Sequence, residues 1–293
     1  MSNGPASRPF CSEISRENDE PLGATASRID RWLLVEYRGL WSHDALAGSG
    51  LSDQVKTRLR ELTAAGPRTR LLLIRRPDRR HHDGIVVYVA DSREGEERLG
   101  ELEIDDHEEL RRLDPFESAT PIDDPLFLVC THGKHDRCCA RYGRPLWEAV
   151  SEELDESSAW QCTHVGGDRF AGNLVALPHG IYYGRVDRDD VADVLDHHFA
   201  GRLALDHYRG RSCWPFFVQA AERRVRAEEG LTGLSDLSLA AVTREAETRW
   251  TVRFDTQVGP REVDVVEELG ELTLLTCSSA VARAPRRYVA MPR

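Results

Sequence analysis

Lysine is almost missing from this 293-residue chain: Lys56 and Lys134 are its two lysines among 39 basic residues. We interpret the shortage as the codon bias of a high-GC bacterial genome rather than as a functional demand for guanidinium groups. The basic residues form no run or stripe, and 50 acidic residues bring the net charge to -11. Such a chain repels phosphate backbones, so we expect no nucleic-acid partner.

Long apolar runs are missing as well. The longest apolar stretches, such as residues 71–74 and 84–90, are far shorter than the roughly 18 residues that a membrane span needs. The first ten residues lack the apolar core of a signal peptide. We therefore expect a cytoplasmic protein with no membrane role.

The sequence has no Cys-x-x-Cys motif, although it holds seven cysteines. Three of them stand alone and receive no functional role in our interpretation, namely Cys11, Cys213 and Cys277. The other four fall within 33 positions, namely Cys130, Cys138, Cys139 and Cys162. In a reducing cytoplasm such a group is more often metal-binding or catalytic than a disulfide framework.

The length suggests two domains at roughly 100–200 residues per domain, and the pattern along the chain divides into four regions. Residues 1–25 are polar and lack periodicity, which predicts a flexible lead-in. Residues 26–120 are predicted as an N-terminal α/β region and residues 121–215 as a thioredoxin-like domain. Residues 216–293 are predicted as a helix followed by an antiparallel β appendage.

In the N-terminal region, apolar runs predict strands at residues 32–37, 70–75 and 84–90. Residues 52–64 are predicted as a helix whose N-cap is Ser52. The segment 91–124 is dense in Asp, Glu and Arg, so we expect a solvated, charged linker with a short helix at residues 107–113.

The second half alternates strands and helices. Strands are predicted at residues 125–130 and 159–164 around a helix at 145–154, and a hairpin at 172–186 precedes a helix at 189–199. This order is typical of a thioredoxin-like sheet, and its loose likeness to the N-terminal region hints at an internal duplication. Residues 215–229 are predicted as a helix, and alternating segments from Arg249 onward, including 272–279, as antiparallel strands.

Two loops of the second half offer metal ligands. Soft thiolates bind iron–sulfur clusters and zinc, and a two-iron cluster needs four protein ligands that converge from loops. The first loop runs from Cys130 to Cys138 and Cys139. The second follows the next strand with Cys162 and His164, and its paired glycines allow close backbone approach. In a thioredoxin-like sheet these strand ends are neighbours.

The segments CTHGKHDRCCARYG (residues 130–143) and HVGGDRFAGNLVALPHGIYYGRV (residues 164–186) resemble the sucrase/ferredoxin-like family, whose members contain a thioredoxin-like ferredoxin domain. The resemblance implies a [2Fe-2S] cluster held by two cysteines of the first loop and by residues of the second. The family's Asp-x-x-Cys spacing favours Cys139 over Cys138. Relatives carry an H-V-G-G-H arrangement, of which this chain keeps His164 and has Asp168 at the second position.

The fourth ligand has two candidates. If the predicted strand 159–164 stays extended, Cys162 and His164 point to the same face, and thiolate is the softer donor, so we favour Cys162. The family spacing instead nominates Asp168. A carboxylate at Asp168 has another role open to it, because it can accept the imidazole N–H of His164.

The leading hypothesis is a one-electron [2Fe-2S] carrier that exchanges electrons with a redox protein partner, either a reductase or an oxidoreductase. A second reading is a thiol redox enzyme that uses Cys138 or Cys139 with Cys130 as the resolving thiol, although adjacent cysteines are poorly placed for a disulfide. A third is a structural zinc site with Cys and His ligands.

Overall fold

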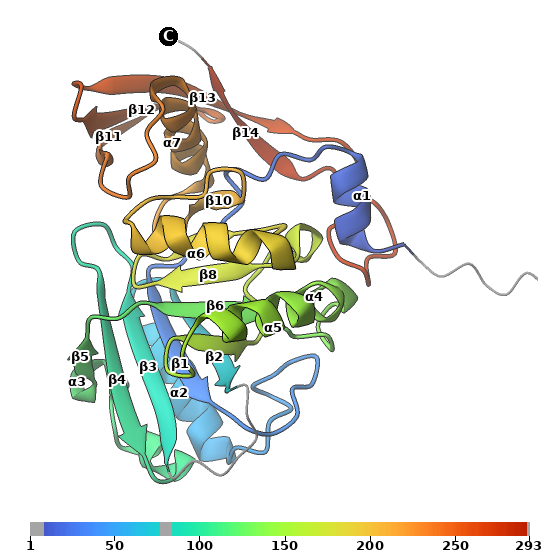
Figure 1. The fold of residues 1–293 in the computed structure, drawn as a ribbon, viewed down its shortest axis with the longest axis vertical. Coiled ribbons are helices and arrows are strands. Elements are labelled where there is room, and N and C mark those ends of the chain that lie inside the picture. The colour runs from blue at the N-terminus through green and yellow to red at the C-terminus, as the bar shows by residue number, and fades with distance from the viewer. Residues whose placement is uncertain (1–8, 77–83, 292–293) are drawn as a thin grey trace, which may run out of the picture.

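The computed structural model describes residues 9–76 and 84–291. Its strands form a ten-stranded mixed sheet and a separate four-stranded antiparallel sheet. Figure 1 shows the C-terminal sheet apart from the large one. The predicted mixed α/β class is therefore confirmed. In the described part of the chain, no helix is both long and apolar enough to cross a membrane.

The N-terminal region forms one half of the large sheet. Its elements are β1 (Arg31–Glu36), α2 (Asp53–Ala65), β2 (Thr69–Arg75), β3 (Ile85–Asp91), β4 (Arg98–Ile104), the 3-10 helix η1 (His107–Arg111), α3 (Pro115–Ser118) and β5 (Thr120–Ile122). Strand β1 pairs parallel with β2 and antiparallel with β3, and β4 and β5 extend the edge. Ser52 caps α2 as predicted, because its side chain accepts a hydrogen bond from the Val55 N–H.

The prediction of a solvated linker over residues 91–124 is wrong. Seven of these residues form β4, in which Leu99 and Ile104 are only 3% exposed. Leu99 and Ile104 pack in different cores on opposite faces of the strand, and Glu101 and Glu103 share the face of Leu99, so the high charge of the segment conceals the strand. The predicted boundary after residue 120 falls within β5, and the sheet continues across it.

The second half repeats this arrangement. Its elements are β6 (Leu126–Cys130), α4 (Arg137–Arg141), α5 (Gly143–Glu153), β7 (Ala159–Cys162), η2 (Asp168–Phe170), β8 (Leu174–Leu177), β9 (Ile181–Tyr183), η3 (Arg188–Asp190), α6 (Val191–Phe199) and β10 (Tyr208–Arg211). The strand order β7-β6-β8-β9 matches β2-β1-β3-β4 in the first half, with the same directions. The predicted thioredoxin-like order is therefore present, and the two halves share one topology.

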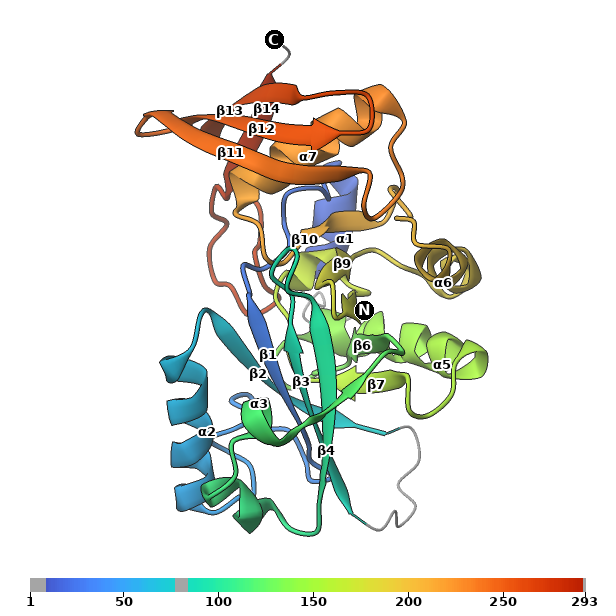
Figure 2. The ribbon, with the colours of Figure 1, turned by 90° about the vertical axis from the view of Figure 1, so that its left-hand side faces the viewer.

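The two half-sheets meet through an antiparallel pairing of β2 with β7, in which Ile74 faces Cys162. One buried core contains apolar residues of both half-sheets, and rings pack across it, with Tyr88 and Trp160 5.6 Å apart between centroids. Helix α2 packs on the outer face of the first half-sheet, whereas α5 and α6 pack on the second (Figure 2). The junction therefore brings the loops that follow β6 and β7 close to the first residues of β2.

The C-terminal region is the predicted antiparallel appendage. Helix α7 (Phe216–Glu229) packs on the sheet formed by β11 (Leu237–Ala246), β12 (Arg249–Thr256), β13 (Arg261–Leu269) and β14 (Arg286–Met291). Residues 237–246 were not predicted as a strand, because most of their side chains are exposed. The predicted strand at 272–279 is wrong: these residues lie in the loop between β13 and β14, where Leu272 is 69% exposed.

The lead-in predicted for residues 1–25 is partly helical. Residues 1–8 lie outside the described residues, but α1 (Cys11–Glu17) buries Cys11 and Ser12. The Arg185 guanidinium donates to the Glu20 carbonyl at 2.8 Å, and Arg169 forms an ion pair with the Glu20 carboxylate. Tertiary contacts from the second half therefore order a segment that has no periodicity of its own.

Candidate metal centre

The first loop begins where β6 ends. The Cys130 N–H donates to the Asn173 carbonyl at 3.1 Å, and the Cys130 side chain is 1% exposed. Asp136 then caps α4 by accepting a hydrogen bond from the Cys138 N–H at 2.8 Å, which directs the Cys139 side chain back toward Cys130. Gly143 starts α5 so close that a Cβ atom there would lie 2.0 Å from the Cys130 carbonyl oxygen.

The second loop leaves the sheet earlier than predicted. Strand β7 ends at Cys162, and Thr163 bonds to β2 instead, with its N–H donating to the Leu73 carbonyl at 3.0 Å. The strand predicted at residues 159–164 is therefore present but ends two residues early, at Cys162. His164 lies beyond the strand, and strand alternation does not decide where its side chain points.

Side chains from three strands and from the segment before β8 hold the second loop by its carbonyl groups. The donors are Arg70 to His164 at 3.2 Å, Tyr182 to Val165 at 3.0 Å, Arg209 to Gly166 at 3.1 Å and Asn173 to Gly167 at 3.0 Å. Gly166 and Gly167 have φ angles of +99° and +78°, which favour glycine. Hydrogen bonds to four successive carbonyl groups therefore fix the path of this loop.

The two loops bring four of the predicted ligands together. The donor atoms of Cys130, Cys139 and His164 all lie within 4.8 Å of one another. Oδ1 of Asp168 accepts a hydrogen bond from the Cys139 thiol at 3.4 Å and lies 2.9 Å from Nδ1 of His164. We call these four residues the donor cluster.

Cys162, our favoured fourth ligand, is not part of this cluster. It pairs in register with Cys130 across β6 and β7 and is fully buried in the core. Among the described residues, its sulfur belongs to none of the groups of three or more converging metal donors. Burial raises the pKa of the Cys162 thiol well above its usual value, which fits a packed core thiol.

Charges inside the donor cluster support one another. The neighbouring Cys139 thiol holds the pKa of Cys130 well below its usual range, and the His164 imidazole contributes to the same shift. Burial disfavours a charged imidazole, but the Asp168 carboxylate and the Cys130 sulfur outweigh it and raise the pKa of His164 to about 9. The pocket therefore stabilises a thiolate beside a cationic imidazole.

Nδ1 of His164 is buried and forms an ion pair with Asp168 Oδ1 at 2.9 Å, without the geometry of a hydrogen bond. A buried nitrogen without a hydrogen bond costs free energy, and ligation of a metal would satisfy it once the imidazole has lost its proton. The donor set of two sulfurs, one imidazole and one carboxylate thus fits a metal group with soft and borderline ligand preferences.

The donor cluster reaches the surface through histidines. His135 stacks on His164 with 3.9 Å between ring centroids and on His43 with 5.0 Å. These three rings, with Arg70 and His132, line an open hollow of about 430 Å³. The sulfurs are thus buried, while His164 connects them to a solvent-facing surface.

Sequence reasoning missed the residues that hold the site rather than bind in it. Arg209 is fully buried and donates to Asn173 Oδ1 at 2.6 Å and to the Thr25 carbonyl at 2.6 Å. Nothing in the local pattern around Arg209 indicates this role, because its partners come from three distant segments. Burial lowers its pKa to about 10, so it remains cationic at neutral pH.

Comparisons with known proteins agree with the resemblance. Residues 22–210 match the family model described as Sucrase/ferredoxin-like. Two yeast proteins, both named Altered inheritance of mitochondria protein 32, are similar over a part of the chain. The one from Meyerozyma guilliermondii is 35% identical over 30% of this chain and 35% of its own, and the one from Clavispora lusitaniae 27% identical over 36% of this chain and 41% of its own.

A solved structure of a thioredoxin-like [2Fe-2S] ferredoxin from Aquifex aeolicus aligns with 32% of this chain and 97% of its own, at 19% identity and a TM-score of 0.29. The matches to the yeast proteins span about two fifths of their length or less. The family match covers well over half of the chain, so this protein belongs to the sucrase/ferredoxin-like family.

Proposed function

We propose that the chain holds a [2Fe-2S] cluster through Cys130, Cys139, His164 and Asp168 and acts as an electron carrier. The observation that carries the proposal is the convergence of three donor atoms within 4.8 Å, from the end of β6, from α4 and from the loop after β7. Such a cluster requires four protein ligands that reach it from several directions. Asp168 is the nearest further donor, at 2.9 Å from His164 Nδ1.

The pocket supplies what the group needs from the protein. Cys130 and Cys139 are each 1% exposed, so water is kept from both sulfurs. When bound, a [2Fe-2S] cluster takes up and releases one electron. Replacing thiolates by a neutral imidazole makes the ligand set less negative, which raises the reduction potential. Nδ1 of His164 is buried without a hydrogen bond, so it gives that imidazole an atom to bind with once its proton has left.

The exposed side of the site favours a protein partner. His164 keeps 20% of its side chain exposed, and the histidine-lined hollow next to it is wide and open. An electron carrier needs one such route between its buried cluster and the surface. We propose that a reductase or oxidoreductase docks over this hollow, and that the protein works in the cytoplasm.

The test is an anaerobic purification of the full chain with its visible spectrum. We expect a brown protein with about two irons and two acid-labile sulfides per chain. Cys130→Ala should remove both, whereas Cys213→Ala, a change of a buried cysteine outside the donor cluster, should remove neither.

Two other results would contradict the proposal. A colourless protein that holds zinc at Cys130, Cys139 and His164 would make this a structural zinc site. A colourless, metal-free protein in which Cys130 and Cys139 oxidise and reduce reversibly would make it a thiol redox enzyme.

A further inference from the structure

Three cysteines that are far apart in the sequence bring their sulfur atoms together. Sγ of Cys138 lies 3.5 Å from Sγ of Cys11 and 3.3 Å from Sγ of Cys277, and the last two sulfurs are 3.6 Å apart. A carboxylate oxygen of Asp136 joins them, since the four donor atoms all lie within 4.8 Å of one another and all four residues are buried. We call this group the three-cysteine cluster.

The sulfur spacing matches ligands of one metal ion. Tetrahedral zinc with Zn–S bonds of about 2.3 Å holds its sulfurs about 3.8 Å apart. The observed edges of 3.3, 3.5 and 3.6 Å make one nearly regular face of such a tetrahedron. A disulfide would need two sulfurs at about 2.05 Å, and no pair in the cluster approaches that distance.

We propose that the three-cysteine cluster binds one structural zinc ion through the sulfurs of Cys11, Cys138 and Cys277 and a carboxylate oxygen of Asp136. Zinc accepts both thiolate and carboxylate ligands, and four protein ligands close the site to substrates. Binding replaces the three thiol protons by the metal ion, with no change of oxidation state.

Neighbouring groups already orient these ligands. Ser12 Oγ donates to Cys138 Sγ at 3.1 Å, and the Cys11 N–H donates to Cys277 Sγ at 3.5 Å. The Asp136 carboxylate accepts the N–H groups of Cys138 at 2.8 Å and Cys277 at 2.6 Å. A carboxylate has about four lone-pair positions, so these bonds fix Asp136 in place and leave a lone pair for a metal.

The surroundings suit a closed, negatively charged site. Apolar side chains shield the sulfurs, since Ala171, Phe10, Tyr142 and Leu274 pack around them. The Arg137 guanidinium lies over the Phe10 ring at 4.9 Å, between the chain segments that supply Asp136 and Cys11. The segments that supply Asp136 and Cys11 therefore also contact each other through their neighbouring residues.

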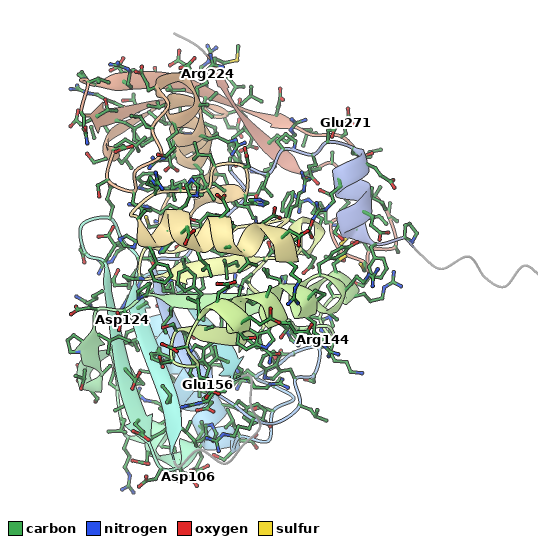
Figure 3. The ribbon with its side chains drawn as sticks, viewed as in Figure 1. Asp106, Asp124, Arg144, Glu156, Arg224 and Glu271 are labelled. Carbon is green, nitrogen blue, oxygen red and sulfur yellow. The ribbon has the colours of Figure 1, made fainter. Side chains whose placement is uncertain are left out.

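A zinc ion would explain what holds three segments together. Helix α1 has seven residues, and the loop between β13 and β14 runs from Gly270 to Pro285 without a strand or helix. Figure 1 shows this red loop against blue α1, next to α4, and Figure 3 labels Glu271 at its start. Loops of this length without secondary structure are uncommon in compact domains, and thiol hydrogen bonds alone are weak.

This proposal is independent of the [2Fe-2S] proposal. The three-cysteine cluster and the donor cluster share no residue, and iron and zinc are measured separately. A protein without iron but with zinc would contradict only the proposed function, and a protein with iron but without zinc would contradict only the present proposal.

The test is the zinc and iron content of the full chain, purified from zinc-supplemented medium, with mass spectrometry as the readout. We expect one zinc per chain, and a loss of at least tenfold in Cys11→Ser and in Cys277→Ser with the iron content unchanged. Cys213→Ser is the matched control, because Cys213 is also buried and lies in neither cluster. Zinc retained in full by Cys11→Ser would overturn the proposal.

X-ray absorption at the zinc edge tests the wild-type protein even if both variants fail to fold. We expect three sulfurs at about 2.3 Å and one oxygen at about 2.0 Å from zinc. A zinc-free protein, or a zinc ion surrounded by nitrogen and oxygen alone, would overturn the assignment.

Discussion

Cys138 and Cys139 are consecutive residues of α4, yet their side chains enter two different clusters. Cys138 Sγ lies 3.3 Å from Cys277 Sγ, whereas Cys139 Sγ lies 3.4 Å from Asp168 Oδ1. Successive residues on an α-helix point about 100° apart, so α4 presents one thiol to each side. This short helix therefore joins the donor cluster to the segment that contains α1.

Replacing Cys138 and Cys139 one at a time should remove one metal and leave the other. We expect Cys139→Ser to lose most of the iron and the visible spectrum while it keeps its zinc. Cys138→Ser should lose the zinc and keep at least half of the iron. Metal analysis of both variants checks this, and the same metal lost from both would show that the two sites are one.

The fourth ligand of the donor cluster can be decided by two substitutions. We expect Asp168→Ala to bleach or strongly shift the visible spectrum, because Asp168 lies beside Cys139 and His164. Cys162→Ala should leave the cluster assembled, because Cys162 converges with no other donors. If Cys162→Ala loses the visible spectrum and Asp168→Ala keeps it, Cys162 is the fourth ligand, as expected from the softer thiolate donor.

Gly167→Ala should disturb the second loop. A Cβ at Gly167 would lie 2.2 Å from Arg209 Nη2, at a φ of +78°. Gly201→Ala is the control, since Gly201 has a φ of +69° with nothing within 4 Å of a Cβ. We expect Gly167→Ala to lower the free energy of unfolding by about 1–3 kcal/mol more than the control and to reduce iron binding. Equal effects in denaturant titrations would show that the contact with Arg209 does not matter.

Acid should destabilise the protein through His198. Burial lowers the pKa of His198 to about 4, with a smaller effect of His179. The unfolded chain therefore binds a proton at about pH 6.5 that the folded chain accepts only near pH 4, so stability falls as pH drops through that window. The shift corresponds to about 3 kcal/mol.

Between pH 7 and pH 4, we expect the free energy of unfolding of His198→Leu to fall by about 3 kcal/mol less than that of the wild type. Denaturant unfolding at several pH values measures this difference. His197→Gln is the control, because His197 lies on the same helix with 30% of its side chain exposed. An unchanged slope in His198→Leu would rule out this source of acid sensitivity.

The buried ion pair of α7 should stabilise the protein far more than the exposed ion pair of the same helix. Arg226 Nε donates to Glu222 Oε1 at 2.8 Å with both side chains almost fully buried, and Tyr208 donates to Glu222 Oε2 at 2.8 Å. Glu222→Ala leaves a buried guanidinium without its carboxylate, which should cost about 3–5 kcal/mol. Glu228→Ala breaks the exposed pair with Arg224 on the same helix and should cost about 1 kcal/mol or less. A similar loss of stability in both variants, measured by thermal unfolding, would contradict the role of burial.

The sequence alone determined the order of strands and helices in the second half. Its apolar runs are short, bounded by turn residues and mostly buried on both sides, as in β6 and β8. It also predicted Cys130, Cys139 and His164 as ligands, because their two segments follow predicted strands and because the Asp-x-x-Cys spacing of the family favours Cys139 over Cys138. Those patterns are local, so they can be recognised without knowledge of the fold.

Only the tertiary structure placed Asp168, and not Cys162, beside Cys139 and His164 and gathered the three-cysteine cluster. Strand β7 ends at Cys162 because Thr163 bonds to Leu73 in the other half of the sheet. Cys11 and Cys277 are 266 positions apart, and no periodicity links residues at that separation. Both outcomes depend on contacts between distant segments, which a sequence pattern does not encode.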